Sequence, residues 1–344
     1  MTPQKKFSSI AFTFILFALS TNLLAATNIE ILPEDTATTI QAKIRSVSSG
    51  TMIVIAPGHY TTTIRLTGLH GDAQLPIKVT AAPGAIIEGA YNKDNNTFSS
   101  GSGINIEKSQ NVIIENFMIS GFERGITIGA CDAIEVKNCT IHDVGNYGIM
   151  SYKSNNTKIS NNTIERSYRE HGIYMSASGN TPTIADNTIR DTHINGIHIN
   201  GTIVNPTVSN NHLERTGTFP VKEGGAAITL VGGVTDPVVR HNTFTGIYGQ
   251  GITVNAPNAA IIENNFVSYT WSGILGLPKA LDLKLTGNTF ADSKVIPLQL
   301  NADVIPSLTA TGQHYAPGIP VCQEQNSQRT YTLGAWKEMG KDVQ

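Results

Sequence analysis

Charge is scarce in this chain and almost balanced. Only 15% of the 344 residues are charged, and the formal net charge is −2. A chain without a basic excess lacks the electrostatic attraction through which nucleic acids and anionic membrane surfaces are usually bound. We therefore expect no nucleic-acid partner and no binding to an anionic membrane surface.

Cysteine is also rare, with Cys131, Cys139 and Cys322 as the full set. An odd number excludes a complete disulfide framework, although a bridge between Cys131 and Cys139 stays open. No close pair of cysteine and histidine has the spacing of a zinc site, so we predict no metal-ligating residues. The cofactor is left open: calcium is compatible with the chain, but no acidic cluster demands it.

Long apolar runs are confined to the N-terminus. Lys5 and Lys6 precede an apolar run from Phe7 to Leu24, which Ala25 and Ala26 follow. This order is typical of a secretory signal peptide, to which we assign residues 1–26. An uncleaved anchor is the alternative, but polar residues at 20–22 leave a short core for a membrane span. We expect export to the periplasm or the outside, with no membrane attachment after cleavage.

What the chain has in abundance is one repeated phrase between Asn111 and Phe290. It consists of an aliphatic residue, two polar residues, a slot for asparagine, one further residue and another apolar residue. The slot holds Phe117, Cys139, Asn162, Asn187, Asn211, Asn242, Asn265 and Asn288, at steps of 22, 23, 25, 24, 31, 23 and 23 residues. Such a period predicts a solenoid, a propeller or an array. The 31-residue step contains an insertion from Thr216 to Gly225.

The phrase also predicts how each turn of chain is built. The residue before the slot is usually Asn, Asp or Gly, which tolerate the left-handed backbone of a sharp bend. Apolar residues alternate around the bend and a Gly-Ile phrase follows it, so each turn holds about three short strands. Stacked turns give an all-β, right-handed parallel β-helix with three parallel sheets and an asparagine ladder. A β-sandwich is the alternative, but hairpins would not keep this register.

The ends of such a solenoid should be covered. Residues 36–47 have helical spacing at Ile40, Ile44 and Val47, which predicts an N-terminal capping helix. We assign residues 27–305 to the β-helix with this cap. The repeat ends after Asn301, and residues 306–344 should form a C-terminal tail that contains Trp336 and packs on the last coils.

With these motifs the chain resembles the right-handed β-helix superfamily of pectate-lyase-like proteins over about residues 30–305. Its opening, Ala56-Pro-Gly-His-Tyr60 with Leu75-Pro-Ile-Lys-Val-Thr80, is similar to that of the alginate lyase and chondroitinase B family. The resemblance implies an exported carbohydrate-active protein. That lyase family uses calcium, but its catalytic motif has no counterpart here. Of the Asp-Pro-His-Asp-like motif of mannuronan epimerases only His171 is comparable, so no catalytic residue is carried over.

Register in the Gly-Ile strands predicts an outward-facing patch. The isoleucines point inward, so alternate residues point outward. On three adjacent coils the outward rows hold aromatic, basic and amide side chains, whereas both ends of the rows revert to Thr, Leu and Gly. The predicted catalytic residues are His171, His198, Tyr174, Tyr152 and Arg169, and the predicted substrate-binding residues are Tyr147, Lys153, Ser176, Asn195, Asn200 and Lys222.

These residue types favour sugar chemistry, because aromatic rings stack on sugar faces. β-Elimination or C5 epimerisation of a uronic acid needs a base, an acid and a cation for the carboxylate. The candidates are the bases His171 and His198, the acids Tyr174 and Tyr152, and the cations Arg169 and Lys153. Hydrolysis needs a carboxylate pair, which the outward rows lack.

Two functions therefore stay open. The first is an exported, monomeric polysaccharide lyase or uronate epimerase whose partner is an acidic polysaccharide. The second is a non-catalytic β-helix that binds glycan or serves as a surface or periplasmic scaffold. The second is kept because a single histidine on a strand is more often a surface residue than a base.

Overall fold

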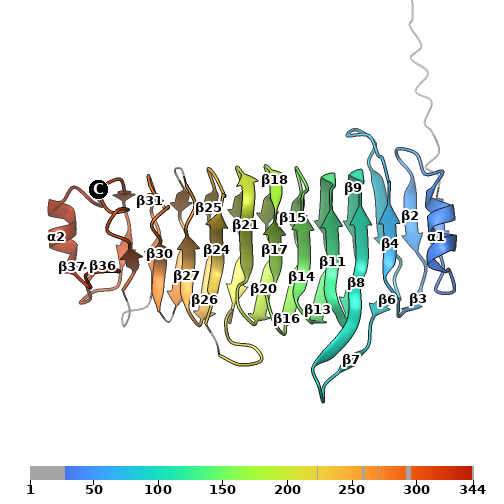
Figure 1. Ribbon diagram of the computed structural model, residues 1–344, viewed down its shortest axis with the longest axis horizontal. Coiled ribbons are helices and arrows are strands. Elements are labelled where there is room, and N and C mark those ends of the chain that lie inside the picture. The colour runs from blue at the N-terminus through green and yellow to red at the C-terminus, as the bar shows by residue number, and fades with distance from the viewer. Residues whose placement is uncertain (1–27, 223, 258–259, 270, 292–295, 343–344) are drawn as a thin grey trace, which may run out of the picture.

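The computed structural model describes residues 28–222, 224–257, 260–269, 271–291 and 296–342. The chain winds into one elongated solenoid with three parallel sheets along its length (Figure 1). The predicted parallel β-helix is thus confirmed. The predicted signal peptide, residues 1–26, lies outside the described residues, and export stays a prediction. No helix in the described part of the chain is long and apolar enough to cross a membrane.

From β2 onward, each coil contributes one strand to each sheet. The first sheet contains β1 (Asn28–Ile31), β2 (Met52–Ile55), β5 (Ile77–Ala81), β9 (Gln110–Glu115), β12 (Asp132–Lys137), β15 (Lys158–Ser160), β19 (Thr183–Ala185), β22 (Thr207–Ser209), β25 (Val238–Arg240), β28 (Ile261–Glu263), β31 (Lys284–Thr286) and β34 (Thr309–Thr311). The second contains β3 (Gly58–Tyr60), β6 (Ala85–Glu88), β10 (Met118–Ser120), β13 (Thr140–Val144), β16 (Thr163–Ser167), β20 (Thr188–Thr192), β23 (His212–Glu214), β26 (Thr243–Ile247), β29 (Phe266–Tyr269), β32 (Thr289–Phe290) and β35 (His314–Tyr315).

The third sheet carries the candidate site. It contains β4 (Ile64–Thr67), β8 (Thr97–Glu107), β11 (Phe122–Gly129), β14 (Tyr147–Tyr152), β17 (Ile173–Ser176), β21 (Ile197–Val204), β24 (Ala226–Gly232), β27 (Gln250–Val254), β30 (Ser272–Gly276), β33 (Leu298–Leu300), β36 (Cys322–Glu324) and the antiparallel β37 (Thr330–Tyr331). Two short strands pair at its margins, β7 (Tyr91–Asn92) with β8 and β18 (Ser178–Asn180) with β21.

The interior of the solenoid is filled by stacked aliphatic side chains. In the third sheet Ile126, Ile149, Ile173 and Ile197 lie in register on successive coils and are fully buried. β-Branched side chains fit the pleated strand, and burying each one stabilises the fold by roughly 1.5–3 kcal/mol. Because these residues point inward, the residues that alternate with them are directed outward.

The asparagine slots form the predicted ladder at the bend between the first and second sheets. From Asn162 to Asn288, each amide nitrogen donates to the amide oxygen on the next coil at 2.9–3.0 Å. The preceding residues adopt the left-handed backbone, with φ of 56° at Asn161 and 58° at Asp186. The ladder runs one step further than predicted, because Asn288 donates to the Gln313 side chain at 3.0 Å.

Cysteine occupies the interior without forming bridges. Cys139 fills a ladder slot, where its backbone N–H donates to the Asn162 side chain at 3.0 Å. All three cysteines are buried free thiols. The Cys131–Cys139 bridge that the sequence left open is therefore absent from the structure.

A short helix, α1 (Ala37–Ile44), lies at the N-terminal end of the solenoid (Figure 1). It begins after Thr36, whose side chain accepts a hydrogen bond from the Thr39 N–H. Ile40 and Ile44 are buried, as the helical spacing predicts. The Gln41 side chain donates to the backbone oxygen of Arg65 at 2.8 Å. This bond satisfies a carbonyl group on the outermost strand of the third sheet. The helix is shorter than the predicted range of 36–47.

The three sheets continue beyond residue 305. β34, β35 and β36 pair in parallel with the first, second and third sheets, so the boundary predicted at 305 lies about one coil too early. The remaining chain comprises β37 and the helix α2 (Leu333–Glu338). Trp336 of α2 is fully buried and lies 5.6 Å from the Tyr331 ring, measured between ring centroids.

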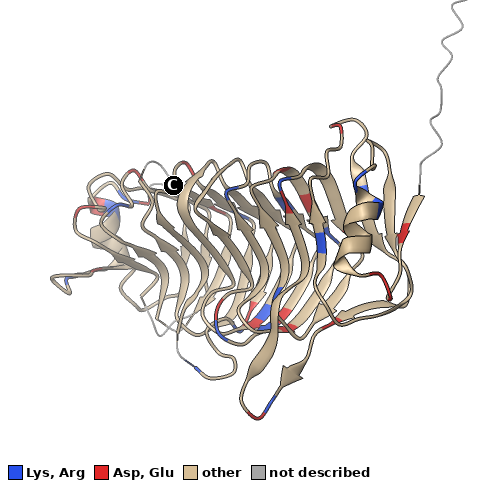
Figure 2. Ribbon diagram, turned by 45° about the vertical axis from the view of Figure 1, so that its right-hand side comes forward, with Lys and Arg blue, Asp and Glu red and all other residues tan. Residues whose placement is uncertain are grey.

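Two segments project from the corner between the second and third sheets, at the lower edge of Figure 1. One is the β7–β8 hairpin and the other is the insertion at residues 216–225. Acidic and basic residues gather on the ribbon in this region (Figure 2), and Arg166 pairs with Asp143 and Arg215 with Asp191. These charges are engaged with one another in ion pairs.

Candidate functional site

The predicted outward row of the third sheet is present in the structure. Met150 of β14 is in register with Tyr174 of β17, and Tyr174 is in register with His198 of β21. These strands lie side by side in the middle of the solenoid (Figure 1). Thr127 and Thr229 occupy the same row on the flanking coils, as expected.

Four rings gather at the start of these strands and form what we call the Tyr–His cluster: Tyr147, His171, Tyr174 and His198. Tyr147 and Tyr174 stack with ring centroids 5.0 Å apart. His171 and His198 approach edge to face at 4.5 Å. His171 is only 5% exposed, whereas the other three rings are half-buried. His171 therefore lies beneath the others, and the expectation that every ring of the site faces solvent is wrong for it.

A chain of hydrogen bonds fixes the proton positions on the two imidazoles. The Ala226 N–H donates to the Asn195 side-chain oxygen at 2.8 Å, so the amide nitrogen of Asn195 is the atom that faces His171 Nδ1 at 3.4 Å. The Asn195 backbone N–H also donates to His171 Nδ1, at 3.3 Å. His171 Nδ1 is thus an acceptor, and neutral His171 carries its proton on Nε2.

That tautomer determines the tautomer of the second imidazole. His171 Nε2 lies 2.7 Å from His198 Nδ1 and donates to it, so neutral His198 carries its proton on Nε2. His198 Nε2 is buried and has no hydrogen-bond partner among the described residues. The cluster therefore presents an N–H donor, oriented by Asn195 through His171, and an unpaired buried donor of this kind favours binding an acceptor.

Burial keeps both imidazoles neutral. It lowers the pKa of His171 to about 3, with the neighbouring His198 and His193 adding to the effect. Burial also lowers the pKa of His198 to about 4. Both values lie well below 6.5, so no imidazolium forms near neutral pH. A base with a pKa near working pH, the role expected for these histidines, is not what the structure places here.

Two charged residues that the sequence did not assign belong to the site. Glu170 Oε2 lies 3.4 Å from His171 Nε2, and burial raises the pKa of the Glu170 carboxyl. Arg124 lies in register with Tyr147 on the adjacent coil, and its charge acts to lower the pKa of Tyr147, which burial raises. Arg124 Nε is buried without a partner among the described residues. Two features of the sequence could have identified them: Glu170 directly precedes His171, and Arg124 occupies the position equivalent to Tyr147 on the adjacent coil.

Arg169 and Tyr152 do not join the Tyr–His cluster. Arg169 donates to both carboxylate oxygens of Glu123 at 3.0 and 3.1 Å and lies over the Phe98 ring of the β7–β8 hairpin. Tyr152 covers Gly129, where an added Cβ would lie 2.5 Å from its ring, and its hydroxyl donates to Glu107 at 3.2 Å. Both predicted catalytic roles are therefore unsupported by the geometry.

The predicted lysines are also elsewhere. Lys153 is exposed on the turn after β14 and borders a different hollow, next to His70 and Asp132. Lys222 Nζ lies 5.4 Å from the centroid of the Tyr248 ring, on the corner of a later coil. Phe219 of the same insertion lies closer to the cluster: its backbone oxygen is 3.1 Å from His193 Nδ1, and its ring centroid is 4.7 Å from that of Tyr168.

The predicted amide and hydroxyl ligands divide between two places. Asn195 is buried within the cluster and positions His171, as described above. Ser176 and Asn200 are half-buried in the next outward row, where Ser176 pairs with Tyr152 and Asn200 with Val231. They can contact a ligand that extends along the third sheet, but they do not touch the imidazoles.

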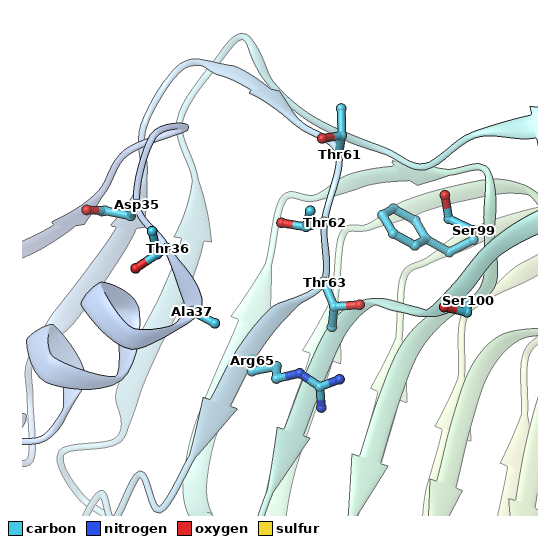
Figure 3. A pocket seen from close by; sticks show the side chains of 10 residues that line it. Asp35, Thr36, Ala37, Thr61, Thr62, Thr63, Arg65, Ser99 and Ser100 are labelled. Atoms are coloured by element: carbon cyan, nitrogen blue, oxygen red, sulfur yellow. The ribbon is translucent and has the colours of Figure 1, made fainter.

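A hollow of about 320 Å³ lies on the third sheet to the N-terminal side of the cluster, and none of the four cluster rings is among its lining residues. Arg65, Asn105, Glu107, Arg124 and Tyr152 are among its lining residues. A wider hollow of about 600 Å³ adjoins it beside α1 and shares Arg65 (Figure 3). This second hollow is lined mainly by Thr and Ser side chains, and its Asp35 carboxylate is occupied by Lys43. The chemistry is therefore concentrated around the cluster.

The described residues do not form a metal centre. Within the described ranges, no group of three or more His, Cys, Asp or Glu side chains could hold a metal ion. Near the cluster the imidazole nitrogens other than His198 Nε2 are engaged with each other and with Asn195. We therefore derive no step through a bound metal, including calcium.

Comparisons with known proteins agree with the geometry of the fold. The family model described as "Right handed beta helix region" matches residues 83–244. Among curated proteins, none matches the sequence. An alginate lyase from Paenibacillus sp. str. FPU-7 has a similar structure, with 19% identity, a TM-score of 0.59 and coverage of 85% of this chain and 96% of that chain.

Two further solved structures show the same architecture. Pectate lyase Pel9A aligns with 13% identity, a TM-score of 0.60 and coverage of 84% of this chain and 80% of its own. The DFA-IIIase from Arthrobacter chlorophenolicus A6, solved in complex with GF2, aligns with 12% identity, a TM-score of 0.58 and 90% coverage of both chains. At these identities the similarity establishes the fold, a right-handed parallel β-helix of the pectate-lyase-like kind.

Proposed function

We propose that this right-handed parallel β-helix of the pectate-lyase-like kind is a carbohydrate-active enzyme that acts on a uronate-containing polysaccharide by β-elimination or C5 epimerisation. The observation that carries the proposal is the buried, unpaired Nε2–H of His198, held in place by His171 and flanked by Tyr174. Enzymes that remove a proton beside a carboxylate stabilise the developing negative charge with oriented donors of this kind.

The roles follow from the atoms that each residue presents. The base removes the C5 proton, and the C5–H electron pair forms the C4=C5 double bond as the C4–O bond breaks and the leaving oxygen takes a proton. In epimerisation the C4–O bond stays intact and a proton returns to the other face of C5. We assign the base to Glu170, whose pKa burial raises, and the acid to Tyr174. His198 and Arg124 bind the substrate carboxylate.

Elimination or epimerisation fits the site better than hydrolysis. Glycoside hydrolysis uses two carboxyl groups on either side of the scissile bond. Glu170 contacts the cluster, but the other nearby carboxylates are engaged: Glu123 with Arg169, and Glu107 with the Tyr152 hydroxyl. Two structures of the same fold are named for alginate and pectate, which supports an acidic substrate.

We also propose that the protein is exported as a monomer. The basic and apolar segment at residues 1–26 supports export to the periplasm or the outside. Mass spectrometry of the protein from its native host should find an N-terminus near residue 27, and an intact Met1 would contradict cleavage. Size-exclusion chromatography with light scattering tests the monomer.

Incubation with alginate, polygalacturonate and a glycosaminoglycan tests the activity. Absorbance in the unsaturated-uronate band reports elimination, and exchange of the C5 proton in D₂O, followed by NMR, reports epimerisation. We expect one of these signals, and a loss of about 100-fold or more in Glu170→Gln and Tyr174→Phe. Phe266→Ala is the control, because Phe266 is 41% exposed on the second sheet, away from the cluster.

A non-catalytic glycan-binding β-helix is the alternative, and the neutrality of both imidazoles favours it over the histidine acid–base catalysis that the sequence predicted. It predicts neither signal with any uronate. Binding would persist and would weaken in Tyr174→Ala. That result would mean that the cluster binds glycan without catalysing a reaction.

A further inference from the structure

The corner between the second and third sheets carries an exposed and a half-buried aromatic ring that are not part of the Tyr–His cluster. Trp271 is 48% exposed, and its ring centroid lies 6.0 Å from that of Tyr248 on the preceding coil. Lys222 Nζ stands over the Tyr248 ring at 5.4 Å. We propose that Trp271, Tyr248 and Lys222 form a second sugar-binding subsite for an anionic polysaccharide; the inference rests on the proposed function because it extends the same substrate.

The surrounding backbone is fitted to the indole. A Cβ added to Gly224 would lie 2.4 Å from a ring atom of Trp271, so the insertion passes directly against the ring. Gly224 also has a φ of +91°, a backbone conformation that residues other than glycine rarely adopt. The Trp271 backbone N–H donates to the Gly249 backbone oxygen at 3.0 Å, which fixes the main chain of this residue to the preceding coil. The insertion therefore packs against one side of the indole, while 48% of the residue stays exposed.

The chemistry of the patch selects the ligand. Indole and phenol rings stack on the apolar faces of sugars, and they do so without requiring a particular hydroxyl pattern. The Lys222 ammonium group over the Tyr248 ring adds attraction for a carboxylate or sulfate on a sugar bound beside it. Rings together with a cation therefore fit an acidic sugar better than a neutral one.

The position of the patch suggests one continuous ligand. His198 pairs with Thr229, Thr229 with Thr253 and Thr253 with Leu275, which places the Trp271 coil three steps beyond His198. At about 4.8 Å per coil this is roughly 14 Å along the axis. A polysaccharide chain lying along the solenoid can reach both places, whereas a single sugar cannot. The subsite would therefore favour polymers over short fragments.

Tryptophan fluorescence provides a direct readout. The chain has two tryptophans, and Trp336 is fully buried at the C-terminal end, so a ligand-induced change reports Trp271. Alginate and polygalacturonate are titrated into the Glu170→Gln variant, which should not consume them, with dextran as the uncharged control. We expect the two acidic polymers to shift the emission and dextran to have a much weaker effect.

Affinity electrophoresis in gels containing the same polymers tests the residues. Trp271→Ala should weaken retardation about tenfold in apparent affinity, and Lys222→Gln should weaken it for the acidic polymers alone. Phe266→Ala removes an aromatic ring of similar exposure, 41% against 48%, from the second sheet and should bind as the parent does. Equal binding by parent and Trp271→Ala would overturn the subsite.

The outcomes separate this inference from the proposed function. Trp271-dependent binding without any product would retain the subsite and remove the catalytic proposal. Product formation with the same polymer KM in Trp271→Ala would retain the enzyme and remove the subsite. An emission shift that depends on protein concentration alone, together with a dimer in size-exclusion chromatography, would make the patch a contact between copies of the chain and would also overturn the proposal.

Discussion

The two imidazoles of the cluster have different exposures, so their removal should have different consequences. His198→Ala deletes the donor from a half-buried position. We expect turnover to fall about 100-fold with little change in melting temperature. His171→Ala removes a ring that is 5% exposed and leaves Asn195 without its acceptor, so both turnover and melting temperature should fall.

The comparison is made by steady-state kinetics and calorimetry on both variants. His171→Gln serves as a conservative control, since its amide oxygen can accept from Asn195 and its nitrogen can donate to His198. Partial recovery of turnover relative to His171→Ala is expected. A His198→Ala variant that loses stability as much as His171→Ala would make the pair structural and end the catalytic assignment.

Acid should destabilise the protein through the same pair. The pKa values of about 3 and 4 lie below the ordinary 6.5, so the unfolded chain binds more protons than the folded one as pH falls from 6.5. The stability contributed by keeping these rings neutral is complete above 6.5 and decreases on acidification. The expected slope is on the order of 1 kcal/mol per pH unit for each histidine.

Urea unfolding at pH 7, 6 and 5 measures how the free energy of unfolding changes with pH. Most ordinary carboxylates titrate below this pH range and so contribute little to the change. His171→Ala, although less stable at pH 7, should lose less of its remaining stability by pH 5 than the parent. An identical slope in both proteins would show that the imidazoles do not control it.

At the residue scale the sequence predicts the row but not where a long side chain ends. Tyr174 and His198 were correctly placed because alternate residues of a strand must face outward. Arg169 was misplaced because its partners, Glu123 and the β7–β8 hairpin, lie 46 and 73 residues away. Lys222 was misplaced for a similar reason: no repeat fixes the course of the insertion. Contacts of this kind depend on tertiary packing, and the periodicity of the sequence does not predict them.

At the element scale, the asparagine ladder fastens one coil to the next. Asn211 donates from its backbone and its side chain to the Asn242 oxygen at 2.9 Å, and its own oxygen accepts two hydrogen bonds from Asn187 at 3.0 Å. Asn211→Leu leaves those donors unpaired in a buried bend. We expect a loss of roughly 3 kcal/mol in the free energy of unfolding.

Chemical denaturation measures this loss, and the neighbouring position supplies the control. Asn210 is exposed and has φ of 56°, a backbone that glycine adopts easily. Asn210→Gly should therefore change stability by no more than about 0.5 kcal/mol. Similar effects at the two positions would mean that the bend, and not the ladder, is what stabilises the coil.

The elements themselves were predicted well because the repeat carries redundant information. Each copy of the phrase specifies a bend and two strands, so the loss of asparagine at Phe117 and Cys139 did not obscure the coil. The end of the solenoid was placed too early because β34–β36 replace the phrase with Gln313 in the slot. Gln313 makes the ladder contact, which its side-chain chemistry allows but the asparagine pattern could not indicate.

At the scale of the whole molecule the solenoid is held by contacts between neighbouring coils, so its ends decide where unfolding begins. The C-terminal end is closed by Trp336, which is fully buried, and by Asp342, whose carboxylate accepts the Gln313 N–H at 2.9 Å and terminates the ladder. Without this closure the last coil would expose its apolar interior and unpaired strand edges to water.

Trp336→Ala tests that dependence. The lost burial should cost about 3–5 kcal/mol locally, so the coils nearest the C-terminus should open first. Hydrogen exchange followed by mass spectrometry should show lost protection in β33–β36, with β14 and β17 near their original protection because they lie many coils away. Leu333→Ala, on the same helix but 39% exposed, is the matched control and should leave the profile unchanged. Equal loss in β14 and β17 would mean that the solenoid unfolds as one cooperative unit, and the Tyr–His cluster would then depend directly on the C-terminal closure.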